Sequence, residues 1–334
     1  MAANTDSRGG AGRGPEAPSS STTGGTSTGV RLVRIEGERA GQRLDNFLLG
    51  QFKGAPRSLV YRVLRTGQVR VNGKRAKPDQ RLEAGDEVRL PPVRLGERET
   101  PAAPHQGQLD RLEDAIVFED ERLLVLNKPS GVAAHGGSGV SFGAIELMRA
   151  ARPNQALELV HRLDRDTSGV LVLAKKRSAL LELQKLLREG GVTKRYLALL
   201  VGRLASTGFT VDLPLERSKQ GGERMVRVGD EGKESVSHFR LVERRGGHSF
   251  VEVGIDTGRT HQIRVHAAHI GHPVAGDDKY GDREANKRLK EKAGLRRLFL
   301  HAAMMEFTLE DGRRPYLLSA PLAPDLAEAL DRLA

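Results

Sequence analysis

The stretch HRLDRDTSGVLVLA, residues 161–174, places a charged loop directly before an apolar segment. The apolar half, residues 170–174, is typical of a buried strand, and two carboxylates and several basic side chains crowd its entrance. Burying a charge is costly unless the charge is paired or has a chemical task. Asp164, next to Leu163 at the mouth of this strand, is therefore the first candidate for a functional group.

Composition excludes several classes of protein. The chain has 334 residues, enough for two or three domains, and no cysteine, which excludes disulfides, thiolate nucleophiles and cysteine-ligated zinc. No apolar run approaches the roughly 18 residues of a membrane span, and the first 30 residues lack the apolar core of a signal peptide. We therefore expect a cytoplasmic protein without a membrane partner.

Positive charge is concentrated near the N-terminus. The net charge is +11, and residues 31–95 hold 15 Lys and Arg against 7 Asp and Glu. Such an excess favours an anionic partner such as nucleic acid. The sequence divides into a disordered tail (1–30, where 19 of 30 residues are Gly, Ser, Thr or Pro), a basic module (31–95), a linker (96–111) and a larger domain (112–334).

The basic module has a compact α+β pattern. A helix is predicted from Arg57 to Thr66, with apolar residues on one face and Arg57, Arg62 and Arg65 largely off that face. Asn72-Gly73 predicts a hairpin turn, and residues 83–86 predict another turn before a final strand. The pattern QRLDNFL…RSLVYRVLRTGQVRVNGKR…LEAGDEV resembles the S4 RNA-binding domain, which implies that the three arginines bind structured RNA.

The larger domain mixes strands and helices. Thr260 is predicted to be the N-cap of a helix that ends at Gly271. The remaining predicted strands are residues 116–118, 123–126, 194–201, 249–255, 299–300, 305–309 and 316–318, and the remaining predicted helices are 142–151 and the leucine-rich segment before Gly190.

Three other kinds of site receive little support. His261, His266 and His269 do not form a His-Glu-x-x-His zinc motif. Residues 136–139, GGSG, lack both the ending of a phosphate-binding P-loop and the Gly-x-Ser-x-Gly spacing of a serine hydrolase. We expect residues 136–139 to form a flexible turn, and we expect no metal site in the protein.

Five blocks occur in order: NKPSG (127–131), HRLDRDTSG (161–169), KRYLALLVG (194–202), TGRTHQIRVH (257–266) and GHPVAGDDKYGD (271–282). Together they resemble the catalytic domain of the RluA-type pseudouridine synthases, and with the S4-like module they most resemble members that act on large-subunit (23S) ribosomal RNA. The resemblance implies an α+β fold with a mixed, mainly antiparallel central sheet. It also implies a monomeric enzyme that isomerises specific uridines by base flipping, with no cofactor.

The same resemblance implies roles for individual residues. Asp164 is the essential carboxylate, acting either as a nucleophile at C1′ or as a base at the 2′ position. Arg264 is its cationic partner, with Arg259 as the second choice, and Tyr196 stacks on the uracil. Arg162 fills the space that the flipped base leaves, His161 braces the loop, Ile263 packs on the uracil, and Lys128 either contacts phosphate or is a solvated loop lysine. Independently of the resemblance, Asp166 is expected to bond the Thr167-Ser168 turn through its side chain.

Two other functions remain open from the sequence. One is an RNA-binding protein that has lost catalysis, which the presence of Asp164, Tyr196 and Arg264 disfavours. The other is a nucleic-acid glycosidase, which would also use an aspartate but would release the base and so lower the mass of the RNA.

Overall fold

A computed structural model describes residues 29–52, 55, 57–93, 103–137, 140–220, 223–310 and 315–334. The chain divides into two compact units, residues 1–100 and 101–334, which we describe separately. Two predicted features lie outside the described residues, wholly or in large part: the disordered tail and the middle of the GGSG turn.

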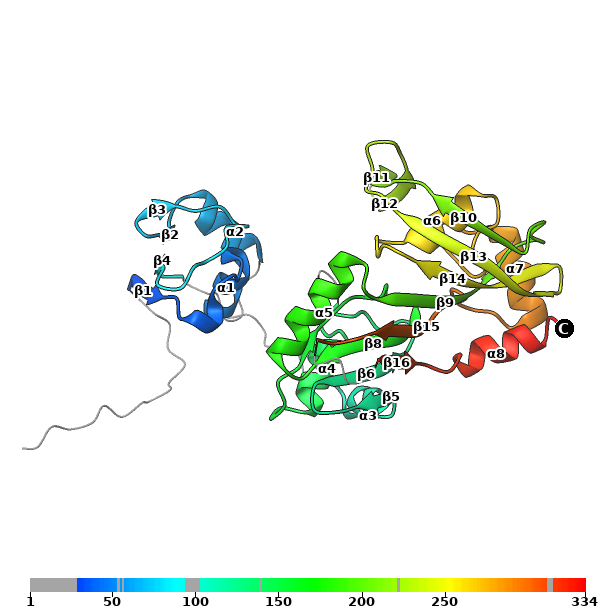
Figure 1. Ribbon diagram of the computed structural model, residues 1–334, viewed down its shortest axis with the longest axis horizontal. Helices are drawn as coiled ribbons and strands as arrows, with labels where there is room; N and C mark the ends of the chain where they lie inside the picture. Colours follow the sequence, from blue (N-terminus) through cyan, green and yellow to red (C-terminus); the bar gives the residue numbers. More distant parts are fainter. Residues whose placement is uncertain are drawn as a thin grey trace, which may run out of the picture. The chain divides into compact units, whose positions relative to one another are not determined.

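In its described part, the first unit is an antiparallel sheet, in strand order β1-β4-β2-β3, with two α-helices (Figure 1). The predicted hairpin turn is confirmed, because Asn72 and Gly73 both have positive φ, 50° and 75°, as a type I′ turn requires. The elements are β1 (Arg31–Arg34), the 3₁₀ helix η1 (Gly37–Arg39), α1 (Leu44–Gln51), α2 (Arg57–Arg65), β2 (Arg70–Val71), β3 (Lys74–Arg75) and β4 (Glu87–Leu90).

Helix α2 presents a basic face to solvent. Its apolar side chains Val60, Val63 and Leu64 are buried in the core of the first unit, whereas Arg62 and Arg65 are exposed, as the periodicity predicts. Arg57 begins the helix, but its side chain lies outside the part that the structure describes.

The second unit is built on a large sheet in the order β10-β13-β14-β9-β15-β8-β6-β5, with β16 beside β15 and β7 beside β8 (Figure 1). Within the described residues, every strand pair of this sheet is antiparallel except β15 with β8, so the predicted mixed, mainly antiparallel sheet is confirmed. The strands are β5 (Ile116–Glu119), β6 (Leu123–Lys128), β7 (Glu158–Leu159), β8 (Ser168–Ala174), β9 (Thr193–Leu200), β10 (Gly208–Asp212), β13 (Val236–Arg245), β14 (His248–Ile255), β15 (Leu300–Phe307) and β16 (Tyr316–Ser319).

A separate hairpin and six helices complete this unit as far as the structure describes it. The hairpin consists of β11 (Leu215–Gln220) and β12 (Glu223–Val228), and it forms its own two-stranded sheet. The helices are α3 (Gln106–Glu113), α4 (Ala144–Ala151), α5 (Arg177–Glu189), α6 (Gln262–His269), α7 (Arg283–Ala293) and α8 (Pro324–Asp331). Among the described helices, none has the length and apolarity to cross a bilayer.

Strand β8 is buried on both faces, as its sequence predicts. Val170 and Val172 belong to a core with Leu180 and Leu183 of α5, whereas Leu171 and Leu173 belong to a second core that includes α4. Because successive side chains of a strand point to opposite faces, an uninterrupted apolar run is needed at such a position. The charged loop therefore enters β8 at a fixed point in the fold.

Gly169 allows β8 to approach β15. It has φ 110°, and a Cβ there would lie 2.1 Å from the carbonyl oxygen of Ala302, so only glycine fits. Gly169 and Ala302 are partners in the pairing of β8 with β15, which is the one parallel strand pair among those that the structure describes in the sheet. The entrance of β8, including the loop of Asp164, is thereby tied to β15.

Some local predictions were wrong. The predicted linker (96–111) ends in α3, whose Leu112 is buried against the sheet, so its last residues belong to the second unit. Residues 299–309 contain one strand, β15, interrupted in register between Ala302 and Met304. The N-cap of α6 is His261 in a left-handed conformation, and not Thr260.

Candidate active site

Asp164 lies in the loop between β7 and β8, in a turn closed by its own backbone. Its carbonyl accepts a hydrogen bond from the Thr167 amide at 3.2 Å, and its side chain is 30% exposed. The prediction that Asp166 bonds this turn is wrong, because its carboxylate contacts the neighbouring Arg165 guanidinium at 3.2 Å. The turn that carries Asp164 is thus closed by backbone atoms.

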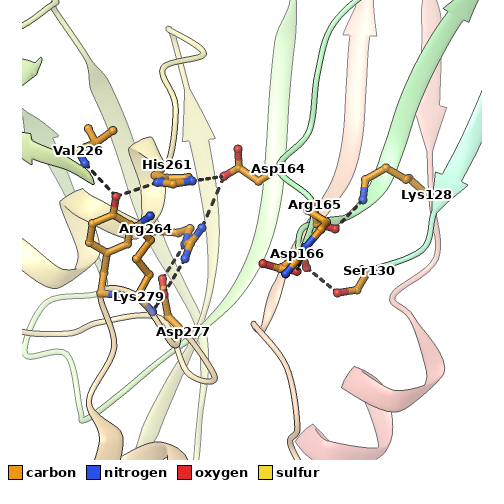
Figure 2. Close-up of polar contacts among 11 residues, drawn as sticks. Lys128, Ser130, Asp164, Arg165, Asp166, Val226, His261, Arg264, Asp277 and Lys279 are labelled. Atoms are coloured by element: carbon orange, nitrogen blue, oxygen red, sulfur yellow. Dashed lines mark hydrogen bonds and ion pairs between the residues drawn. The ribbon is translucent and has the colours of Figure 1, made fainter. Parts of the chain in front are cut away.

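The NKPSG segment, which begins with the last two residues of β6, contacts this turn on the side away from Arg264 (Figure 2). Lys128 Nζ donates to the carbonyl of Arg165 at 3.1 Å and to those of Pro129 and Val132 at 2.9 and 2.7 Å. Ser130 Oγ donates to the Asp166 carbonyl at 2.8 Å. Lys128 and Ser130 therefore join the two segments by donating hydrogen bonds to backbone carbonyls of the Asp164 loop.

The predicted phosphate contact of Lys128 is contradicted by this geometry. The residue is 0% exposed, and burial lowers its pKa to about 7, against the opposing effect of the Asp166 and Asp164 carboxylates. An amine enclosed by three carbonyls cannot reach an RNA phosphate. Lys128 instead stabilises the loop that carries Asp164 from inside the protein.

Replacing Lys128 with methionine tests this assignment. We expect the free energy of unfolding to fall by roughly 2 kcal/mol, because three buried carbonyls lose their donor. The salt dependence of RNA binding, measured by titration at several salt concentrations, should stay unchanged because Lys128 touches no phosphate. If RNA binding by the variant depended less steeply on salt concentration, Lys128 would have to contact an RNA phosphate after all.

Arg264 of α6 faces Asp164 across the site, with Nη1 3.9 Å from Oδ2 of the carboxylate (Figure 2). It is held by Asp277 through two hydrogen bonds of 2.7 Å, and both side chains are almost wholly buried. Burial opposes the charge on each, but their mutual hydrogen bonds raise the pKa of Arg264 and lower that of Asp277. Arg264 thus offers a fixed positive charge to Asp164.

His261 is the second group near the carboxylate. Its Nε2 lies 3.8 Å from Asp164 Oδ2, and its Nδ1 lies 2.8 Å from the hydroxyl of Tyr280. The Tyr280 ring also lies 5.1 Å from the Arg264 guanidinium carbon. Asp164 is therefore approached from one side by two groups that Tyr280 touches.

A cavity of about 610 Å³ opens above the carboxylate, and a smaller one of about 80 Å³ lies beside it. Tyr196 of β9 and Arg162 line both, and Ile263 lines the smaller one. The arginine and lysine residues that line the larger cavity are Arg162, Arg165, Arg188, Lys194 and Arg259. The site is thus a cleft with an anionic centre and a cationic rim, which suits a polyanion.

Two residues beside the cleft are uncharged. Burial raises the pKa of Tyr196, and the nearby Asp164 adds to the effect, so its hydroxyl stays neutral. Burial lowers the pKa of His161 to about 4, and its Nε2 accepts the amide hydrogen of Val172 at 3.2 Å. His161 therefore connects the charged loop to β8 as a neutral acceptor.

Arg259, the second choice as the partner of Asp164, is held differently. Its Nε donates to the Glu234 carbonyl at 3.1 Å, and its side chain lines the rim of the cleft. No cluster of metal-ligating side chains occurs within the described ranges. His266, one of the three histidines considered above, is buried between Ser237 and the Leu213 carbonyl.

Sequence reasoning missed Asp277, His261 and Tyr280 as parts of the site. Asp277 and Tyr280 both lie in the quoted block GHPVAGDDKYGD, and His261 lies in TGRTHQIRVH. The available signal was the density of ionisable groups in those blocks, but it did not indicate which of them meet.

Comparison with known proteins places these features in a family. The RNA pseudouridylate synthase model matches residues 122–269, and the S4 domain model matches residues 42–88. Ribosomal large subunit pseudouridine synthase C of Escherichia coli (strain K12) is 54% identical over 308 residues, 91% of this chain and 97% of that protein. The protein of the same name from Pasteurella multocida (strain Pm70) is 50% identical, over 91% of this chain and 94% of its own.

Two solved structures of proteins named for the same family also resemble this chain. Human RNA Pseudouridylate Synthase Domain Containing 4 superposes with a TM-score of 0.56 at 26% identity, covering 68% of this chain and 95% of its own. Human RNA Pseudouridylate Synthase Domain Containing 1 gives a TM-score of 0.56 at 28% identity, with 68% and 90% covered. The cleft around Asp164, the two matching models and these relatives together show that the chain belongs to the RNA pseudouridylate synthase family and carries an S4 domain.

Proposed function

We propose that this protein converts specific uridines of large-subunit ribosomal RNA to pseudouridine, with Asp164 as the essential carboxylate. The observation that carries the proposal is the Asp164 carboxylate facing the fixed charge of Arg264 inside a cation-rimmed cleft. Its substrate is suggested by the names of relatives that are at least 50% identical over nine-tenths of the chain.

The reaction rearranges bonds without adding or removing atoms. The bond from uracil N1 to C1′ breaks, the base rotates, and C5 becomes bonded to C1′ while the C5 proton moves to N1. Asp164, which faces the fixed charge of Arg264, acts at the sugar as nucleophile or base. The neutral Tyr196 lies against the base and takes part in moving the C5 proton. Because the uracil that leaves C1′ is also the group that is rejoined to it, the scheme needs no cofactor.

The cleft requires the uridine to leave its stack. Unstacking costs a few kcal/mol, which contacts inside the pocket have to offset. We propose that Arg162, exposed at the cleft, takes the vacated place in the RNA and that Ile263, in the smaller cavity, packs on the uracil. The protein would work as a monomer in the cytoplasm, a compartment that suits a chain without cysteine.

The test is to incubate ribosomal RNA with the purified protein and map pseudouridines, alongside RNA from cells that lack it. The proposal expects new pseudouridines in RNA of unchanged mass. RNA that loses the mass of uracil would support the glycosidase, and binding without any change in the RNA would support a non-catalytic RNA-binding protein.

We propose that the S4 domain, residues 31–95, docks on ribosomal RNA through α2. Changing Arg62 and Arg65 together to glutamine should weaken binding and reduce the salt slope by about 0.7 to 0.9 for each arginine that binds a phosphate. The rate at saturating RNA should be retained, because both residues lie in the first unit. Arg332→Gln, an exposed arginine of the second unit paired with Glu328, is the matched control. An unchanged slope in the double variant would count against docking through α2.

A further inference from the structure

We propose that Tyr280 is a positioning residue, whose hydroxyl fixes His261 as a neutral imidazole with its Nε2–H directed at Asp164. The inference rests on the proposed function, since it concerns the same carboxylate. It assigns to His261 the role of a second donor beside Arg264, and to Tyr280 control over that donor.

The hydroxyl of Tyr280 has two partners. It accepts the amide hydrogen of Val226 at 3.1 Å and lies 2.8 Å from His261 Nδ1. Since the amide can only donate, it occupies one lone pair of the hydroxyl and leaves the O–H free to point at Nδ1. A neutral imidazole that accepts at Nδ1 must carry its proton on Nε2. Nε2 is the nitrogen that faces Asp164 at 3.8 Å.

The surroundings of His261 favour the neutral form. Burial is the main cause that lowers its pKa, and it outweighs the opposing effect of Asp164. Arg264 and Lys279 lower the pKa further, whereas Asp277 raises it. Burial also raises the pKa of Tyr280, which keeps its hydroxyl protonated. Both partners of the 2.8 Å contact are thus uncharged near neutral pH.

The backbone places His261 for this contact. His261 has φ 56°, and Asn72 is the other non-glycine residue with positive φ in the described ranges. Left-handed backbone is unfavourable for such a residue, and it tends to occur at functional sites. Tyr280 itself is fixed, because its amide donates to Asp277 Oδ1 at 3.0 Å and its ring contacts the Arg264 guanidinium. One tyrosine therefore contacts both groups that face Asp164.

The hydroxyl of Tyr280 also links the hairpin β11–β12 to the site by a hydrogen bond. Val226 belongs to β12, and the hairpin forms no strand pairing with the large sheet among the described residues. The hydrogen bond from its amide thus fixes the orientation of the Tyr280 hydroxyl, so the hairpin position affects the donor at Asp164.

Tyr280→Phe tests the proposal, because it keeps the ring and removes the hydroxyl. Two-bond nitrogen–proton NMR correlations of the histidine ring, with His261 assigned through His261→Gln, report which nitrogen carries the proton. Wild type should show the proton on Nε2, and the variant a mixture of tautomers. The single-turnover rate on ribosomal RNA should fall about tenfold with RNA affinity unchanged, since one neutral hydrogen bond is lost.

Tyr316→Phe is the matched control, because Tyr316 also loses a hydroxyl bonded at 2.8 Å, to Asp120, in the same unit. Tyr280→Phe combined with His261→Gln should be no slower than His261→Gln alone, because Tyr280 acts through His261. Additive losses would overturn the proposal, as would an Nδ1–H tautomer in wild type. If wild type forms no pseudouridine, the proposed function fails, but the tautomer measurement still decides this inference.

Discussion

Asp164→Asn is expected to lower the single-turnover rate by roughly 10⁴-fold or more, while RNA binding is retained. Asparagine has nearly the shape of aspartate but carries no charge, so it can neither attack C1′ nor accept a proton. The turn should survive, since it is closed by the backbone carbonyl of residue 164. Rapid mixing with excess enzyme measures the rate, and filter binding measures the affinity.

Asp166→Asn is the matched control, made two residues away in the same loop. The Asp166 carboxylate meets the exposed side chain of Arg165, so its loss should change the rate little. Substantial turnover by the Asp164 variant, or equal losses in the two variants, would remove Asp164 from its proposed role.

Patterns within a short stretch predicted much of the fold correctly. The apolar run of β8, the amphipathic period of α2 and the Asn72-Gly73 turn each depend on neighbouring residues, and all three are confirmed. The larger architecture and the grouping of Asp164 with Arg264 came instead from the resemblance, because their separation of about a hundred residues leaves no local trace.

Lys128 shows why its role could not be predicted from the residues. A lysine that follows an apolar strand and precedes Pro129 is typical of a solvated loop. Its burial depends on the Arg165 carbonyl, which lies 37 positions along the chain. Backbone acceptors carry no sequence signature, so no inspection of side chains could have found this contact.

Strands that lack a regular pattern were also missed. Strands β10 to β13 lie within residues 208–220 and 223–245, where many of the described side chains are half-buried or exposed, so the apolar alternation is weak. Residues 300–307 were likewise predicted as two strands but form one, β15, whose pairing with β9 shifts register between Ala302 and Met304. Both errors arise because strand pairing, and not local sequence, stabilises these segments.

Asp277→Asn is expected to destabilise the second unit by about 3 to 5 kcal/mol, because it leaves the buried guanidinium of Arg264 without its counter-charge. Turnover should fall as well, since Arg264 loses the two hydrogen bonds that hold it near Asp164. Hydrogen exchange across β8 and β15 measures the stability of this unit directly, which matters because the two units need not unfold together.

Asp325→Ala is the control for burial. Asp325 holds Arg297 by two hydrogen bonds of 2.6 and 2.8 Å, the same geometry as Asp277 with Arg264, but its side chain is 60% exposed. Its loss should cost no more than about 1 kcal/mol, because solvent screens an exposed pair. Equal costs for the two variants would show that burial does not set the strength of the Asp277 pair.

The effect of Asp277 should also depend on pH in one direction. Its pKa in the folded protein lies below the ordinary value of 3.8, so the pair stabilises the fold fully above about pH 4. As the pH falls through the lower folded-state pKa, Asp277 becomes protonated and this stabilisation is lost. The stability difference between wild type and Asp277→Asn should therefore be constant near neutral pH and shrink only in acid. A difference that shrank between about pH 6 and 8 would implicate another group, with His261, which contacts both Asp164 and Tyr280, as the first to examine.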